Sequence, residues 1–417
     1  MTPELLFHVL LALAVVVVAG RTLGLLVARI GQPPVIGEVL AGILLGPSLL
    51  GALAPEAEAF IFPAFARPTL AVIAQIGVIL YMFVVGLEFD PASLRKRAAP
   101  YLVTSQASIA VPFALGWGLA ALIHRELSQP GVPFLAFAMF MGVAMSITAF
   151  PVLARILTDR GLSRTELGTA ALTCAAVDDV SAWCLLAVSV GIARATFADA
   201  LSVLGLTVLF IAGMVFVARP IAIRLTANAN PEPSTGAVTW TLAGLLVSAV
   251  VAELIGIHAI FGAFLFGAFV PATSPIADKL QHERTPVVTI LFLPAFFAIT
   301  GLRTEIGLLG SWWDWMVCLA IVVLATAGKF GGTILAGRLT GMPNRLAARL
   351  GILLNTRGLM ELVVLNVGLD LGVISPRLFT MMVIMALVTT AMTTPLLDLV
   401  RPDRSEEEEH AERRAHA

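Results

Sequence analysis

The chain has 417 residues, of which 59% are hydrophobic and 13% are charged. Soluble domains are about a quarter charged and less than half apolar, so this composition argues against a soluble enzyme. The 26 basic and 27 acidic residues leave no basic excess to meet phosphates, which argues against a nucleic-acid-binding protein. The composition therefore favours a membrane domain, whose segments are taken below in chain order.

Apolar runs follow one another along residues 1–400. A helix that crosses a bilayer needs about 20 mostly apolar residues, and by this measure the sequence predicts thirteen crossings. They are residues 5–28, 33–52, 68–89, 99–123, 133–157, 166–193, 200–223, 236–255, 258–274, 286–305, 312–337, 346–370 and 376–400. Only residues 253–257 separate the eighth run from the ninth, so a total of twelve stays open. The chain begins without a basic segment or a cleavage site, and we expect the first run to be retained.

Lysine and arginine in the connections predict the orientation. With thirteen spans and an external N-terminus, sixteen of these residues flank cytoplasmic ends and five flank external ends. This asymmetry follows the positive-inside rule and is lost if one span is removed. We expect a multi-pass protein of the bacterial plasma membrane. Its acidic tail, residues 401–417, is then a solvated cytoplasmic end.

Glycine positions suggest an internal repeat. The second and ninth runs each contain two glycines five residues apart, starting at Gly37 and Gly262, and the third and tenth runs end on similar stretches around Gly86 and Gly301. The partners are seven spans apart, and because seven is odd they cross the membrane in opposite directions. Inverted repeats of this kind are typical of secondary transporters.

The fifth and twelfth runs, which the repeat pairs with each other, are both interrupted. Pro151 lies within the fifth run, and a proline removes a helical hydrogen bond. Asn355, Arg357 and Glu361 make the twelfth run polar in its middle. Two interrupted helices at corresponding positions of two halves predict a transport site.

Two adjacent acids, Asp178 and Asp179, lie in the middle of the sixth run. Neighbouring helical residues point about 100° apart, so the two carboxylates face different partners. Burial and a second acid nearby both increase the proton affinity of a carboxylate, and such a group holds either a proton or a metal cation. Lys329, within the eleventh run, is the natural partner of one aspartate, unless it snorkels to water.

Four other charged residues lie in or near the predicted spans. Arg357 and Glu361 are four residues apart and pair if that segment is helical, and Arg357 is equally well a structural clamp or a mover of ions. Glu88 is expected at the membrane interface. Glu38, after two prolines at the start of its run, is either interfacial or a gate.

Several of these segments together resemble the monovalent cation:proton antiporter-2 family. They are residues 32–50, Thr148–Arg155, Asp178-Asp179 with Trp183, Gly328-Lys329 and Asn355–Glu361. The resemblance extends in order over residues 10–400. It implies an all-α polytopic membrane protein with inverted repeats and two broken, crossing helices, like the NhaA and NapA antiporters.

The resemblance also implies a division of labour and a homodimer. Residues 1–400 form the antiporter domain. Its core helices are roughly residues 99–193 and 312–400, its dimerisation helices 5–89 and 236–305, and its linker helix 200–223. We expect membrane lipids as surroundings, no nucleic-acid partner, and no nucleotide-binding regulatory domain on this chain.

By resemblance, Asp179 is the main carrier of cation and proton, and Asp178 pairs with Lys329. Ser146 and Thr148, with carbonyls of the broken helices, are expected to supply further oxygen ligands. No cofactor is expected; Na⁺ or K⁺ and H⁺ are the transported ions. Because two acids stand together, the exchange is expected to be electrogenic.

The predicted function is therefore secondary exchange of a monovalent cation for protons by alternating access, and not enzymatic catalysis. The same fold also hosts cation-coupled symporters of organic anions. An intramembrane aspartyl protease is a weaker alternative, because it needs two aspartates on separate helices that face each other. A channel is the third alternative.

Overall fold

The computed structural model describes residues 3–88, 98–162, 165–194, 197–227, 235–271, 274–280 and 288–400. Regular structure in these ranges is helical and contains no strand, as predicted from the composition. The chain forms two compact units, each built from segments distant in sequence. Unit 1 comprises residues 1–21, 38–95 and 187–302, and unit 2 comprises residues 22–37, 96–186 and 303–417.

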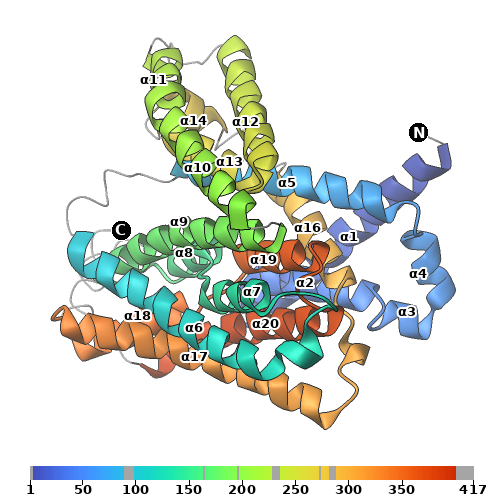
Figure 1. Ribbon diagram of the computed structural model, residues 1–417. Helices are drawn as coiled ribbons and strands as arrows, with labels where there is room; N and C mark the ends of the chain where they lie inside the picture. The colour runs from blue at the N-terminus through green and yellow to red at the C-terminus, as the bar shows by residue number, and fades with distance from the viewer. Residues whose placement is uncertain are drawn as a thin grey trace. The chain divides into compact units, whose positions relative to one another are not determined.

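Unit 1 is built from helices of the N-terminal region and the middle of the chain (Figure 1). They are most of α1 (Pro3–Arg29) and α2 (Pro34–Leu45), then α3 (Leu50–Leu53), α4 (Pro55–Ile61), α5 (Arg67–Glu88), α10 (Phe197–Gly213), the π-helical turn η2 (Met214–Ala218), α11 (Arg219–Ala227), α12 (Thr235–Ile255), α13 (Ala259–Phe269), α14 (Pro275–Lys279), the π-helical turn η4 (Val288–Phe292) and α16 (Leu293–Leu302).

Unit 2 follows the same principle with the remaining helices (Figure 1). They are α6 (Ala98–Leu127), α7 (Phe134–Ser146), α8 (Phe150–Asp159), most of α9 (Glu166–Arg194), the 3₁₀ turn η5 (Ile306–Leu308), α17 (Trp312–Leu339), α18 (Asn344–Leu354), α19 (Leu359–Asp370) and α20 (Pro376–Leu399). Helix α17 packs along α6, α18 and α20.

Glycines bring the helices of unit 1 into backbone contact. In α16, a Cβ added at Gly301 would lie 2.7 Å from the Cα of Gly42 in α2, and one added at Gly86 in α5 would lie 3.0 Å from the Cα of Gly267 in α13. The second predicted span therefore packs on the tenth, and the third on the ninth. The repeat pairs the second span with the ninth and the third with the tenth. Under this pairing, the contact between the second and tenth spans corresponds to the contact between the ninth and third, as a two-fold related repeat requires.

In the described residues, each of the thirteen apolar runs coincides with a helix or with two or three consecutive helical elements. In the described ranges, ten helices are long and apolar enough to cross a membrane. The pair α18 and α19 forms an eleventh span, bent by 46° at its break. Helices α7 and α13 are apolar but have only 13 and 11 residues. The count of thirteen crossings stays a prediction.

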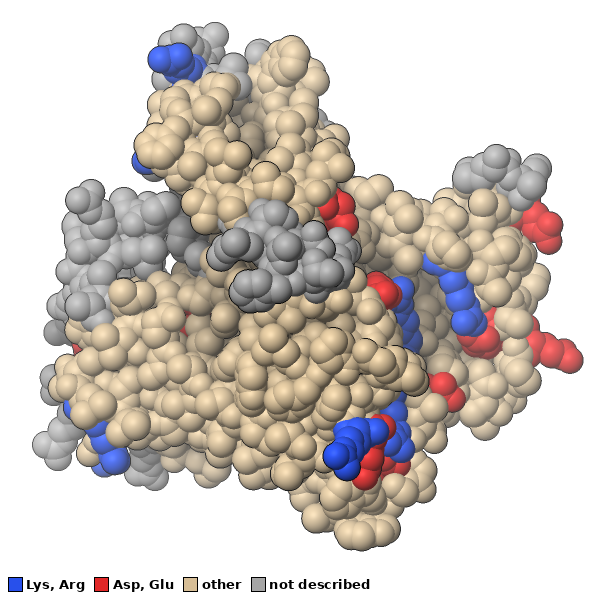
Figure 2. Space-filling model, in the orientation of Figure 1, with Lys and Arg blue, Asp and Glu red and all other residues tan. Residues whose placement is uncertain are grey.

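The outer surface of these helices is strongly apolar. Leu122, Leu254 and Leu339 are each more than three-quarters exposed, and Figure 2 shows large areas without Lys, Arg, Asp or Glu on the face in view. Contiguous exposed apolar surface of this extent marks an interaction with lipid or protein. It agrees with helices that are surrounded by a bilayer.

A small-residue contact between α6 and α17 leads to the first prediction. A Cβ added at Gly332 would overlap the carbonyl oxygen of Ala107, whereas one added at Gly331 meets nothing within 4 Å. We expect Gly332→Ala to lower the free energy of unfolding by about 1–3 kcal/mol, the usual effect of overpacking. The matched change Gly331→Ala should be neutral or slightly stabilising. Thermal unfolding in detergent measures both, and equal midpoints would contradict the close contact.

Candidate functional site

Two broken spans meet in unit 2. Helix α7 ends at Ser146 and α8 begins at Phe150, while α18 ends at Leu354 and α19 begins at Leu359. The two extended segments between them hydrogen-bond each other: the Ala149 N–H donates to the Thr356 carbonyl at 2.9 Å. Backbone at this depth is tolerated outside a helix only where protein or a cavity satisfies it. Each broken span thus supplies partners for the other.

Pro151 stands beside the first break rather than in the middle of it. It is the second residue of α8, in the first turn, where a missing N–H has no helical partner to lose. The unwound residues are 147–149, immediately before the expected position. The second break, residues 355–358, falls within the polar stretch that the sequence indicated.

Asp178 is surrounded by donors from two other helices, α6 and α17, and from the first break. Ser105 Oγ donates to its Oδ1 at 2.5 Å, and Ser108 Oγ donates to its Oδ2 at 3.0 Å. Thr148 Oγ1 lies 2.7 Å and Lys329 Nζ 3.2 Å from the same Oδ2. Lys329 and Asp178 are both fully buried, so this lysine does not snorkel to water.

The hydrogen bonds around Asp178 form a connected network. Lys329 Nζ also donates to Thr148 Oγ1 at 2.7 Å, and Thr148 reaches the carbonyl of Leu354 at 2.9 Å. The network therefore ties α6, α9 and α17 to both breaks. Satisfied buried networks of this kind hold one geometry, because every lost partner strands a polar group. We interpret Asp178 as a carboxylate whose acceptor positions are already in use.

Asp179, the next residue, has a different environment. It is 2% exposed, and its Oδ1 has no hydrogen-bond partner among the described residues. The backbone of Phe150, at the first turn of α8, hydrogen-bonds the carboxylate. The N-terminus of a helix carries partial positive charge that favours an anion. Asp179 therefore combines a positioned carboxylate with one oxygen left free for a ligand.

Arg357 clamps the end of α7. Its guanidinium donates to the carbonyl oxygens of Ala144 and Met145 and to Glu361 Oε2, each at 2.6 Å. The last carbonyls of a helix have no helical donors and carry partial negative charge. All of these groups are buried. Of the two roles left open by the sequence, the geometry favours the structural clamp over a mover of ions.

The remaining predicted residues differ in their suitability as ligands. Ser146 Oγ donates back to the Val143 carbonyl at 2.9 Å, within its own helix. Thr148 is engaged with Asp178 and Lys329, as described above. Neither side-chain atom of Asn355 has a partner among the described residues, although the residue is 1% exposed. Asn355 is thus the better-placed amide oxygen of the breaks.

Ser105 and Ser108 were missed in the sequence. They stand three residues apart on α6, which places them on one helix face, and this spacing within an apolar run was the available signal. Glu38 belongs to unit 1. The side chain of Glu88 and the acidic tail lie outside the described residues.

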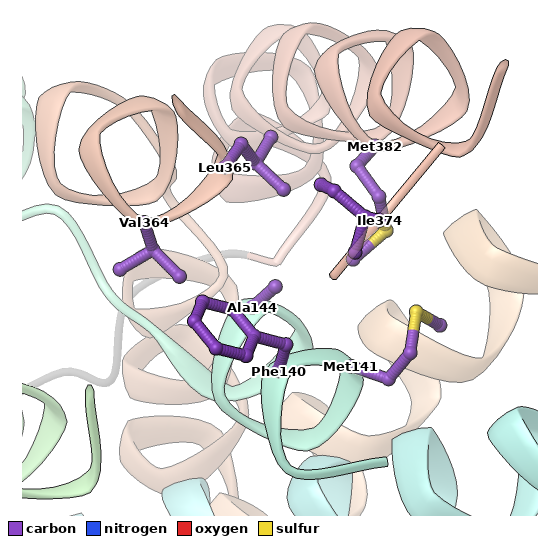
Figure 3. Close-up of a pocket in the computed structure, with 7 residues that line it drawn as sticks. All are labelled: Phe140, Met141, Ala144, Val364, Leu365, Ile374 and Met382. Atoms are coloured by element: carbon purple, nitrogen blue, oxygen red, sulfur yellow. The ribbon is translucent and has the colours of Figure 1, made fainter. Parts of the chain in front are cut away.

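A small cavity lies beside the clamp (Figure 3). It is lined by Phe140, Met141, Ala144, Val364, Leu365, Ile374 and Met382. These side chains come from α7, α19, α20 and the connection before α20. The cavity of about 10 Å³ is barely large enough for one water, and apolar cavities of this size stay dry. The side chains that line this cavity therefore offer an ion no polar ligand.

A helical membrane domain with two broken spans that meet beside buried carboxylates is the architecture of a secondary transporter. Residues 11–399 match the model of the family described as sodium/hydrogen exchanger, transmembrane, and the chain belongs to this family. The predicted family and the prediction of a transporter rather than an enzyme are thereby confirmed.

Proteins of similar sequence agree with this family assignment. The Na(+)/H(+) antiporter NhaS4 of Synechocystis is 45% identical over 407 residues, covering 96% of this chain and 99% of that protein. Cation/H(+) antiporter 18 of Arabidopsis thaliana is 38% identical and the K(+)/H(+) antiporter 1 of Saccharomyces cerevisiae 36% identical, covering 96% and 89% of this chain. The chain spans about half the length of these two proteins, 50% and 44%.

A solved structure supports the fold. The sodium proton antiporter MjNhaP1 of Methanocaldococcus jannaschii matches with a TM-score of 0.63 at 13% identity, over 94% of this chain and 96% of that one. The predicted antiporter-type helical fold is therefore confirmed.

The second prediction concerns the Asp178–Lys329 contact. We expect Asp178→Asn and Lys329→Gln each to destabilise the purified protein by about 3–5 kcal/mol, because each strands a buried charge. The double variant should lose less than the sum of the two single losses. Thermal unfolding of the four proteins measures the cycle. Strictly additive losses would mean that the two groups do not interact.

Proposed function

We propose that this protein exchanges a monovalent cation, Na⁺ or K⁺, for protons across the membrane by alternating access. The observation that carries the proposal is the unequal state of two adjacent buried acids. Asp178 has its oxygens engaged by four side chains, whereas Asp179 keeps Oδ1 without a partner among the described residues. The names of the relatives include both Na⁺/H⁺ and K⁺/H⁺ antiporters, which is why both cations are proposed.

Competition at one carboxylate couples the two ions. Asp179 binds either a cation or a proton, because the same oxygen serves both. Oxygen ligands suit hard cations, and the side-chain oxygen of Asn355 with carbonyls of the breaks is available to complete the shell.

The cost of burying a charged Asp179 makes movement of the site conditional on a bound cation or proton. An uncompensated carboxylate is costly in a low-dielectric environment. Asp179 without cation or proton therefore resists passage through an apolar barrier, and an occupied Asp179 passes. We propose unit 2, which carries the site, as the moving core, and unit 1 as the scaffold and dimerisation part of a homodimer.

Asp178 and Lys329 are proposed as the source of electrogenicity. Their ion pair engages Asp178 while Asp179 exchanges ions. Protonation of Asp178 would break the pair and add a second proton to each cycle. Transport that stays voltage-sensitive in Lys329→Gln would place that second proton elsewhere.

The rival functions have distinct signatures. In an aspartyl protease the two catalytic carboxylates face each other, whereas Asp178 and Asp179 are neighbours on one helix with different partners. A symporter of organic anions would show ion flux that depends on an organic substrate. A channel would show a linear current without proton coupling. Proteoliposomes with an internal pH dye, challenged in turn with Li⁺, Na⁺ and K⁺, separate these cases.

The third prediction concerns Asp179. Asp179→Asn keeps the shape of the side chain and removes its titratable charge, so cation-driven proton movement in proteoliposomes should vanish. Folding should survive, because the free Oδ1 has no partner to lose. Asp370→Asn is the matched control, since Asp370 is 59% exposed and should leave exchange intact. Normal exchange by Asp179→Asn would refute its role as carrier.

The fourth prediction concerns orientation. The lysine and arginine distribution predicts an external N-terminus and a cytoplasmic C-terminus. A cysteine at Ala417, in a background with Cys184→Ser, should react with an impermeant reagent only after cells are permeabilised. A cysteine at Arg125 should react in intact cells. The reverse pattern of labelling would invert the topology.

A further inference from the structure

Unit 1 contains a groove that plays no part in the transport site. It lies among α10, η2, α11, α12 and α13, and has a volume of about 510 Å³. In Figure 1, α11 and α12 run side by side at the top of the view. The groove is lined mostly by apolar side chains, among them Val217, Ile221, Trp240, Val247, Val251 and Phe266. Trp240 is 68% and Val247 62% exposed, so the groove is open along one side.

Local sequence explains why the helices do not close over this space. Residues 214–218 form a π-helical turn directly before Pro220, which lacks the N–H that an α-helical ladder needs. Gly213 and Gly244 contribute no side chain to the wall. A Cβ added at Gly213 would meet nothing within 4 Å. At Gly213 the wall of the groove is therefore bare backbone, whereas the ring of Phe266 covers Gly244.

The hydroxyl groups in the wall are already in use. Thr241 Oγ1 donates to the Ala237 carbonyl at 2.9 Å, and Ser248 Oγ donates to the Gly262 carbonyl at 2.7 Å. These are the two hydroxyl side chains among the lining residues, and the indole N–H of Trp240 is the other side-chain donor. The remaining lining side chains are apolar, so the matching chemistry is mainly hydrocarbon.

The shape of the groove suits an extended chain. The lining runs from Phe210 to Ile221 on one wall and from Trp240 to Val251 on the other, and the eleven steps between the ends of each wall rise about 16 Å. A single acyl chain can lie along this length with its carbons against the apolar side chains of both walls.

Charge at one end indicates the headgroup. Arg224 follows Ile221 by three residues and so continues the stripe that faces the groove. Arg224 and the nearby Arg219 are both exposed, and neither has an ion-pair partner in the part of the chain that the structure describes. Cationic side chains next to a membrane segment attract anionic headgroups.

From these observations we propose that the groove is a binding site for an anionic phospholipid. One acyl chain lies between α11 and α12, along Val217 and Trp240, and the headgroup phosphate contacts Arg224. The bound chain fills the gap left by the π-helical turn and so joins α10 and α11 to α12.

Trp240 provides the signal for a test. The purified protein in detergent is titrated with phosphatidylglycerol brominated on one acyl chain, and bromine quenches tryptophan at short range. The emission of Trp240 is the difference between each protein and its Trp240→Phe version. Phosphatidylcholine with the same brominated chains is the second arm. We expect saturable quenching at low lipid fraction, stronger for phosphatidylglycerol.

Two variants probe chain and headgroup separately. Gly213→Leu directs a side chain into the groove and should weaken the saturable quenching at least about tenfold. Gly205→Leu, also on α10 and also with nothing within 4 Å of an added Cβ, lies outside the groove lining and is the matched control. Arg224→Gln should reduce the preference for phosphatidylglycerol about fivefold, the equivalent of about 1 kcal/mol for one cationic side chain.

The outcomes decide the proposal. Quenching that rises linearly with lipid fraction in the unaltered protein would overturn it, as would equal saturation in Gly213→Leu and Gly205→Leu. A change of oligomeric mass in Gly213→Leu without any lipid dependence would assign the groove to a second copy instead. If Gly213→Leu does not fold, an unchanged lipid preference in Arg224→Gln overturns the headgroup contact.

Discussion

A charge buried at bilayer depth has to be matched within the protein, and the organisation of unit 2 follows from this constraint. Two fully buried ion pairs, Asp178–Lys329 and Arg357–Glu361, adjoin the broken spans. Each pair uses its remaining donors on the unwound backbone: Lys329 through Thr148, and Arg357 directly on the last carbonyls of α7. The breaks exist because charged groups satisfy them, and the charged groups are tolerated because the breaks supply partners.

Small residues make this arrangement reachable. Gly328 and Gly332 let α17 approach Pro112 and Ala107 of α6. At that separation the ammonium of Lys329 shares one carboxylate with Ser108 of α6. A larger residue at either glycine would separate the helices and leave the ammonium short of Asp178. The close packing of α17 on α6 therefore sets the distance over which Lys329 and Asp178 interact.

The consequence for function is that the neighbouring residues Asp178 and Asp179 have different hydrogen-bonding environments. Asp178 and Asp179 are consecutive residues of α9, so their side chains point about 100° apart. Both oxygens of Asp178 accept hydrogen bonds, whereas Asp179, at the N-terminus of α8, keeps Oδ1 without a partner among the described residues. The first holds the core together, and the second is free to exchange ligands. The apolar cavity lined by Phe140 and Val364, beside α7 and α19, offers an ion no polar ligand.

The sequence by itself determined the class of fold, the positions of both broken spans and the residues at membrane depth that carry charge. These follow from local composition, because a bilayer demands long apolar runs and makes each exception conspicuous. Only the tertiary structure decided the partners. Lys329 lies 151 residues from Asp178, and Arg357 lies 213 residues from Ala144. Ser105 and Ser108 looked like ordinary small residues of an apolar helix until α6 packed against α9 and α17. Whether a hydroxyl faces lipid or a carboxylate depends on which helices lie next to it, and no pattern within one span contains that information.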